Sequence, residues 1–150
     1  MEDLQPIIIT IIILFIIVGF WSAISLLISR LSGWHRISEY YWGKLEHYNK
    51  RLFFQGFSTS MLGGYSNFVT YAVSDEYLGI SVFFLYRIGH PPLKIPLADI
   101  NGIQKNMLFI PRVHLQLRKL PDKRVIIPYR LAQKIEKASG GAWTFERPLS

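Results

Sequence analysis

The strongest constraint on this chain is a run of 22 residues without a charge, from Ile7 to Ile28. A helix of this length is about 33 Å long, which is enough to cross a hydrocarbon core of about 30 Å. Lipid offers the backbone no hydrogen-bond partners, so such a segment must form a helix even when it is rich in isoleucine. The run predicts a transmembrane helix rather than a buried core helix or strand.

A cleaved signal peptide is the nearest alternative for this segment. It needs a basic start, an apolar stretch of about 7–15 residues and a small-residue cleavage site. Here the chain starts with the acidic Met1-Glu2-Asp3, the apolar run is longer, and the stretch from Ser22 to Ser25 is a poor cleavage site. We therefore expect residues 1–30 to be an uncleaved anchor.

The charges that flank the run predict its orientation. No Lys or Arg precedes the run, and five follow it within about 25 residues. These five are Arg30, Arg36, Lys44, Lys50 and Arg51. Because basic flanks stay in the cytoplasm, we expect the N-terminus outside and the C-terminal part inside.

One face of the predicted helix carries two small residues, Gly19 and Ala23, four positions apart. This spacing lets two membrane helices approach closely, so the pair is a candidate helix-packing face. The alternative is that Gly and Ala are simply common in membrane helices.

Residues 31–50 carry an apolar and aromatic stripe at steps of three and four, which predicts a short amphipathic juxtamembrane segment. The stripe consists of Trp34, Ile37, Tyr41, Leu45 and Tyr48. Trp and Tyr favour the headgroup boundary, so Trp34, Tyr41 and Trp42 are candidate interfacial anchors. Packing of the stripe on the following domain is the alternative, and the two do not exclude each other.

Residues 51–139 have the alternating pattern of a mainly-β domain. The predicted strands are Arg51–Gln55, Phe68–Val73, Leu78–Phe84, Leu93–Leu97, Val113–Leu117 and Val125–Ile127. A turn or bulged hairpin is expected at Gly63-Gly64, and a break at Asp99–Gly102. A helix is expected over Tyr129–Ser139, followed by a tail over 140–150. About six or seven antiparallel strands with one helix favour two sheets or an open barrel.

The strand succession resembles pleckstrin-homology and GRAM-like domains. The resemblance is carried by Tyr77–Val82, Pro92–Ile100, Val113–Leu117 and Val125–Pro128. It implies a pleckstrin-like antiparallel barrel or sandwich of six or seven strands, closed by a short C-terminal helix.

The whole chain also resembles a set of uncharacterised bacterial proteins with one N-terminal membrane helix. That resemblance is carried by the segments Ser32-Gly33-Trp34-His35-Arg36 and Arg87-Ile88-Gly89-His90-Pro91-Pro92. It implies a single-pass protein of the bacterial inner membrane, and it implies no activity.

No arrangement of residues predicts catalysis. The chain has no Cys, which excludes disulfides, a cysteine nucleophile and thiolate metal sites. Its four histidines lack the spacing of metal motifs. The adjacent acids Asp75-Glu76 fit a solvated hairpin tip better than an acid–base pair. We therefore expect no enzyme, no cofactor and no metal.

The remaining signal is a basic excess. Seventeen basic and eight acidic residues follow the run, which gives that part a net charge of +9. A basic domain tethered to the bilayer faces anionic headgroups, which favours lipid over nucleic acid as its partner. The densest basic cluster lies in one predicted hairpin, and its residues are candidate headgroup contacts: Arg118, Lys119, Lys123 and Arg124. A solvated turn is the alternative.

These features together predict a non-enzymatic, membrane-anchored binding module on the cytoplasmic face. It would recognise anionic lipid headgroups or a membrane protein partner. The alternative is a structural or accessory subunit of a membrane protein complex, with the apolar helix as its main contact.

Overall fold

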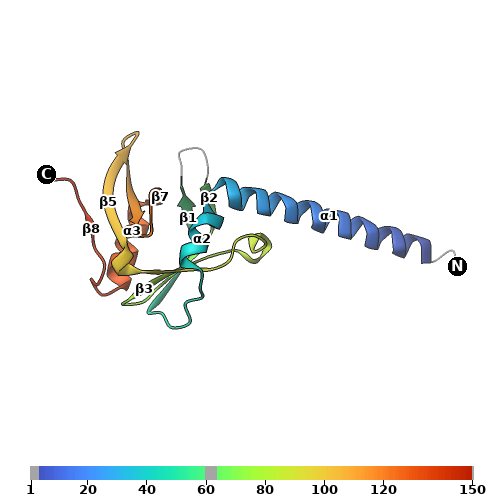
Figure 1. The fold of residues 1–150 in the computed structure, drawn as a ribbon, viewed down its shortest axis with the longest axis horizontal. Helices are drawn as coiled ribbons and strands as arrows, with labels where there is room; N and C mark the ends of the chain where they lie inside the picture. The colour runs from blue at the N-terminus through green and yellow to red at the C-terminus, as the bar shows by residue number, and fades with distance from the viewer. Residues whose placement is uncertain (1–3, 60–63, 150) are drawn as a thin grey trace.

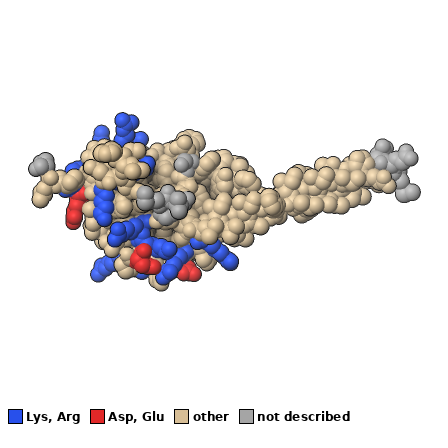
Figure 2. All heavy atoms as spheres, turned by 90° about the horizontal axis from the view of Figure 1, so that it is seen from above, with Lys and Arg blue, Asp and Glu red and all other residues tan. Residues whose placement is uncertain are grey.

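The computed structural model describes residues 4–59 and 64–149. The apolar run forms helix α1, Leu4–Leu31, which projects from the rest of the chain as a shaft (Figure 1). Its described side chains are exposed as far as Phe20, and Figure 2 shows no charged residue along the shaft. The predicted apolar helix is therefore confirmed as long and apolar enough to cross a membrane, features that a signal sequence shares.

A short turn through Gly33, whose φ of 76° favours glycine, leads into helix α2, Trp34–Tyr41. The predicted stripe is buried over this helix, at Trp34, Ile37 and Tyr41. The helical prediction is wrong beyond Tyr41, because Trp42 adopts an extended conformation and the chain then runs without helix to residue 49.

Eight strands form one sheet within the described residues. They are β1 Lys50–Ser58, β2 Gly64–Val73, β3 Tyr77–Val82, β4 Leu93–Pro96, β5 Ile100–Met107, β6 Ile110–Leu117, β7 Leu120–Pro128 and β8 Phe145–Glu146. Their order is β4-β3-β2-β1-β7-β6-β5-β8. Two 3₁₀ helices, η1 Phe84–Tyr86 and η2 Leu97–Asp99, flank β4. All neighbouring strands are antiparallel except β5 and β8, which are parallel.

The sheet is open, which corrects the expectation of a closed barrel or sandwich of six or seven strands. Within the described residues, its two halves are joined where Ser58 of β1 pairs with Ile126 of β7, and they run in different directions (Figure 1). Alternate residues of both halves enter a shared core, which explains the period-two pattern of the sequence. Examples are Val69, Tyr71 and Val73 from β2 and Val113, Leu115 and Leu117 from β6.

The predicted break at Asp99–Gly102 is placed too late, because the chain leaves β4 at Pro96, passes through η2 at Leu97–Asp99 and enters β5 at Ile100. The hairpin between β5 and β6 turns at Leu108 and Phe109, whose φ angles are 49° and 67°. Such turns usually carry Asn or Gly, so apolar residues there give no turn signal. Of the predicted Gly63-Gly64 turn, Gly63 lies outside the described residues, while Gly64 begins β2.

The C-terminal helix is confirmed as α3, Tyr129–Ala138, with Leu131, Ala132 and Ile135 buried. The predicted tail over 140–150 is wrong as far as Glu146. After Gly140 and Gly141 the chain returns to the sheet as β8, burying the side chains of Trp143 and Phe145. The folded β domain therefore runs from α2 through β8.

Candidate functional site

A cavity of about 510 Å³ opens over the outer face of β3, beside the loop that joins β3 to β4. The segment between α2 and β1 forms one wall, and residues 87–93 form another. The wall segment crosses β3 at Gly79, where a Cβ atom would lie 2.8 Å from the Leu45 side chain. Glycine at this position lets the segment lie directly on the sheet.

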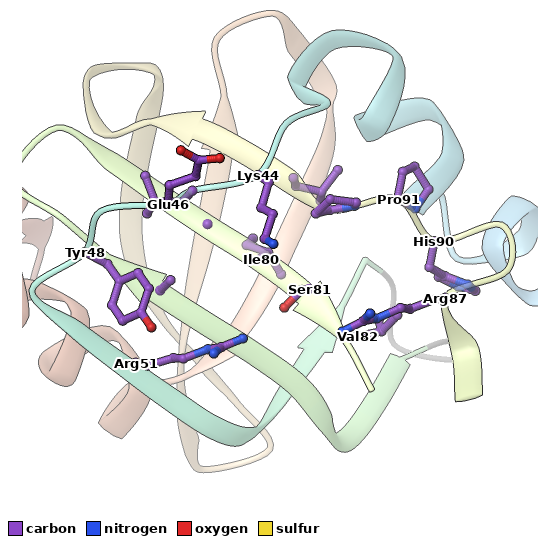
Figure 3. Close-up of a pocket in the computed structure, with 15 residues that line it drawn as sticks. Lys44, Glu46, Tyr48, Arg51, Ile80, Ser81, Val82, Arg87, His90 and Pro91 are labelled. Atoms are coloured by element: carbon purple, nitrogen blue, oxygen red, sulfur yellow. The ribbon is translucent and has the colours of Figure 1, made fainter. Parts of the chain in front are cut away.

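Three cations from separate parts of the chain line this cavity: Lys44, Arg51 and Arg87. All three are exposed, and their side chains extend toward the space above Ser81 (Figure 3). Among the described residues none of the three forms an ion pair. Glu46 also lines the cavity, but its carboxylate is turned away from the Lys44 amine (Figure 3). The lining therefore carries three cations and one acid, and this net positive charge attracts an anion.

The remaining polar groups of the cavity suit an oxyanion. Ser81 and Tyr48 contribute hydroxyl groups to the lining, and a hydroxyl donates one hydrogen bond. The guanidinium of Arg51 lies 5.8 Å from the centroid of the Tyr48 ring, which restrains the arginine near the mouth. Arginine forks bind phosphate or carboxylate oxygens in pairs, whereas lysine acts as a point charge.

A buried polar network fixes the wall that carries Arg87. The indole Nε1 of Trp34 donates to the carbonyl of Pro91 at 2.9 Å. His90 Nε2 bonds the hydroxyl of Tyr65, which lies 3.0 Å from the hydroxyl of Ser32. Residues 32–36 and 87–92, which are far apart in the sequence, therefore meet here.

His90 is only 2% exposed, and this burial lowers the pKa of its imidazole. The neutral ring is favoured, with one nitrogen as donor and the other as acceptor. Nδ1 lies 3.3 Å from the Ile88 carbonyl, an acceptor, so a proton on Nδ1 leaves Nε2 to accept from the Tyr65 hydroxyl. His90 therefore positions the wall and adds no charge to the cavity.

The four candidate headgroup contacts of the β6–β7 hairpin lie outside this cavity. They are Arg118, Lys119, Lys123 and Arg124. The hairpin packs against α2, where the backbone N–H of Lys119 donates to the Tyr41 hydroxyl at 3.0 Å. Its acid, Asp122, pairs with Arg36 at 3.5 Å. The four basic residues therefore lie close together on the hairpin, outside the cavity. A contact between them and a lipid headgroup stays a prediction.

The candidate interfacial anchors separate into two kinds. Trp34 is 0% exposed and Tyr41 is 2% exposed, so neither can reach a lipid headgroup. This corrects their assignment, because the stripe packs into the domain core instead. Trp42 is 73% exposed and stays available to an interface. On α1, Gly19 and Ala23 both lie on exposed surface.

The sequence reasoning missed Lys44, Arg51 and Arg87, because they come from three segments with no common spacing. The only signal was the basic excess itself. Within the part of the chain that the structure describes, no three His, Asp or Glu side chains gather into a metal site. Comparison with protein-family models, with curated proteins and with solved structures finds no match for this chain.

Proposed function

We propose that the protein is a non-enzymatic binding module, anchored in the bacterial inner membrane by α1, whose cavity binds an anionic lipid headgroup. The observation that carries this proposal is the convergence of Lys44, Arg51 and Arg87 on one cavity, with no ion pair to any other residue that the structure describes.

The position of the cavity supports a lipid as the source of the anion. The carbonyl oxygens of Tyr86 and Ile88, on either side of Arg87, lie 3.3 Å and 2.7 Å from the Ser25 hydroxyl of α1, which can donate to either of them. Ser25 precedes the first charged residue after the run, Arg30, by five positions, or about 7.5 Å of helix. If α1 spans the bilayer, the cavity mouth lies beside the phosphate layer.

The expected strength follows from the charges. A Lys or Arg beside an anionic surface contributes about 1 kcal/mol, so three contribute about 3 kcal/mol, or roughly 100-fold in affinity. Such a contact is weak for a free domain. Because α1 holds the domain at the surface, the local concentration of headgroups is high and weak binding is sufficient.

The proposed orientation places the β domain in the cytoplasm, as the basic flank of α1 indicates. We expect a fluorescent protein fused after Ser150 to be bright and alkaline phosphatase fused there to be inactive. The reverse pattern would contradict the cytoplasmic assignment and require a different leaflet for the headgroup.

Removing the cavity cations is expected to abolish selective lipid binding. The full chain is purified in detergent, delipidated and titrated with short-chain phosphatidylglycerol or phosphatidylcholine, and bound lipid is counted by native mass spectrometry. The triple variant Lys44→Gln, Arg51→Gln, Arg87→Gln should bind phosphatidylglycerol roughly 100-fold more weakly, because three charge-assisted contacts are lost.

The matched control removes three exposed cations from α3: Arg130→Gln, Lys134→Gln and Lys137→Gln. It changes the net charge equally and should keep the native affinity. A second comparison changes Arg118, Lys119, Lys123 and Arg124 of the hairpin to Gln. Loss of binding in that variant, with binding intact in the cavity variant, would move the site to the hairpin. Equal affinity in all variants would end the headgroup proposal.

An accessory subunit of a membrane complex is the second candidate function. The observation that favours it is the exposed Gly19 and Ala23 face of α1, where a Cβ added at Gly19 meets no atom within 4 Å. Small residues at this spacing suit close packing of a partner helix. A protein that copurifies in fixed stoichiometry, and is lost when Gly19 and Ala23 are changed to Leu, would support this role.

A further inference from the structure

The segment between β3 and β4 exposes large apolar side chains in one continuous stretch. Phe83 is 43% exposed, Phe84 61%, Leu85 49% and Ile88 44%. The segment lies beside the domain end of α1, away from the β5–β6 hairpin (Figure 1). An exposed apolar patch of this kind marks a site of contact with another protein or with a membrane. Here the patch adjoins an apolar helix.

The segment is fastened to α1 through its carbonyl groups. Trp21 Nε1 donates to the Leu85 carbonyl at 2.9 Å. The Ser25 hydroxyl lies 2.7 Å from the Ile88 carbonyl and 3.3 Å from that of Tyr86, and the Ser29 hydroxyl donates to Gly89. These contacts use polar side chains of α1 that a simple anchor would not need.

The other carbonyls of the segment are paired within it. Phe83 accepts from the N–H of Tyr86, Phe84 from Arg87, and Arg87 from His90. Ser25 has one proton for its two neighbouring carbonyls, and the Nδ1–H of His90, 3.3 Å from the Ile88 oxygen, supplies a second donor. Every carbonyl from residue 83 to 89 therefore has a donor within reach. Irregular backbone at membrane depth needs its polar groups satisfied by protein groups, and the carbonyls of this segment meet that need.

The close approach of segment and helix depends on glycine. A Cβ at Gly89 would lie 2.8 Å from a methyl carbon of Leu26 and 3.2 Å from its Cα, and the φ of Gly89 is 79°. The ring of Trp21 on α1 also packs against that of Tyr86 in the segment, with 5.5 Å between the ring centroids. The segment and α1 therefore form one packed unit.

We infer that residues 83–88 enter the cytoplasmic leaflet alongside α1 and contact lipid hydrocarbon, an inference that rests on the proposed anchoring by α1. Trp21 and Ser25 lie within the charge-free run, about 13 Å and 7.5 Å before Arg30 along the helix. The segment bonded to them shares this depth. Arg87 is its only charge, and a flexible stem lets an arginine head reach the headgroup layer, where it lines the cavity.

The chain has no Cys, so single cysteines carry a nitroxide label cleanly. Three variants of the full chain are reconstituted in vesicles: Phe84→Cys in the segment, Ile16→Cys in α1 and Phe109→Cys at the β5–β6 turn. Phe109 is the matched control, since it is apolar and 101% exposed. Collision rates with oxygen, which concentrates in lipid, and with a nickel chelate, which stays in water, are measured for each label.

We expect labels at 84 and 16 to collide with oxygen more than with nickel, and the label at 109 to do the reverse. A label at Ile88→Cys should agree with the one at 84. If 84 and 88 behave like 109 while 16 remains in lipid, the inserted segment is refuted and the anchor stands. If the label at position 16 also collides mainly with the nickel chelate in water, the anchoring and the proposed function fail together.

Discussion

Replacing Trp34 with alanine is expected to destabilise the β domain by about 3–5 kcal/mol, the usual cost of removing a large buried aromatic side chain. Trp34 is 0% exposed, and its ring lies 4.9 Å from Phe57 and 5.5 Å from His90, centroid to centroid. Its indole also holds the Pro91 carbonyl. Since domains are stable by only about 5–15 kcal/mol, much of the stability would be lost.

Hydrogen–deuterium exchange of the full chain in bilayer discs measures this effect. Amides of β2 and β4 should exchange much faster in Trp34→Ala than in the native chain. The control is Trp42→Ala, which removes the same side chain from the residue that follows α2, where it is 73% exposed. Equal exchange in the two variants would mean that α2 does not complete the core.

The elements that the sequence predicts correctly are those whose pattern arises from their own environment. The charge-free run must be helical, and alternation at Leu78, Ile80 and Val82 reflects one buried face of β3. Burial of Leu131 and Ile135 on α3 follows from helical spacing in the same way. In each case the local pattern and the tertiary structure agree.

The errors arise where tertiary contacts override local signals. Leu108 and Phe109 turn the β5–β6 hairpin with positive φ, although their side chains carry no turn preference. Trp34 and Tyr41 are residue types that suit a membrane interface, yet the sheet buries them. A stripe at steps of three and four indicates an apolar helix face, and it does not say whether lipid or the protein core covers that face.

The candidate site shows the same limit. A cluster adjacent in sequence, such as Arg118 and Lys119, is easy to find, whereas Lys44, Arg51 and Arg87 converge only after folding. Ser25 inside the apolar run and Ser29 just after it were likewise unexplained by the sequence, because their acceptors lie about 60 residues away in the chain. Long-range hydrogen bonds leave no periodic trace.

Replacing Trp143 with alanine is expected to cost about 3–5 kcal/mol as well, although the residue follows two glycines near the end of the chain. Its side chain is 4% exposed, and its indole donates to the Ile100 carbonyl at 3.1 Å. The ring lies against the β5 backbone, since a Cβ at Gly102 would be 2.7 Å from it. Loss of this ring opens a cavity and removes the support of β8.

The matched control for Trp143 is Leu149→Ala, because Leu149 lies in the same C-terminal segment and is 102% exposed. Urea unfolding of the full chain in detergent, followed by far-ultraviolet circular dichroism, should show a lower midpoint for Trp143→Ala and an unchanged midpoint for Leu149→Ala. The slope of the free energy of unfolding against urea concentration should stay the same if only stability changes. A native midpoint in Trp143→Ala would return residues 140–150 to the status of a tail, because β8 would then contribute nothing to the free energy of unfolding.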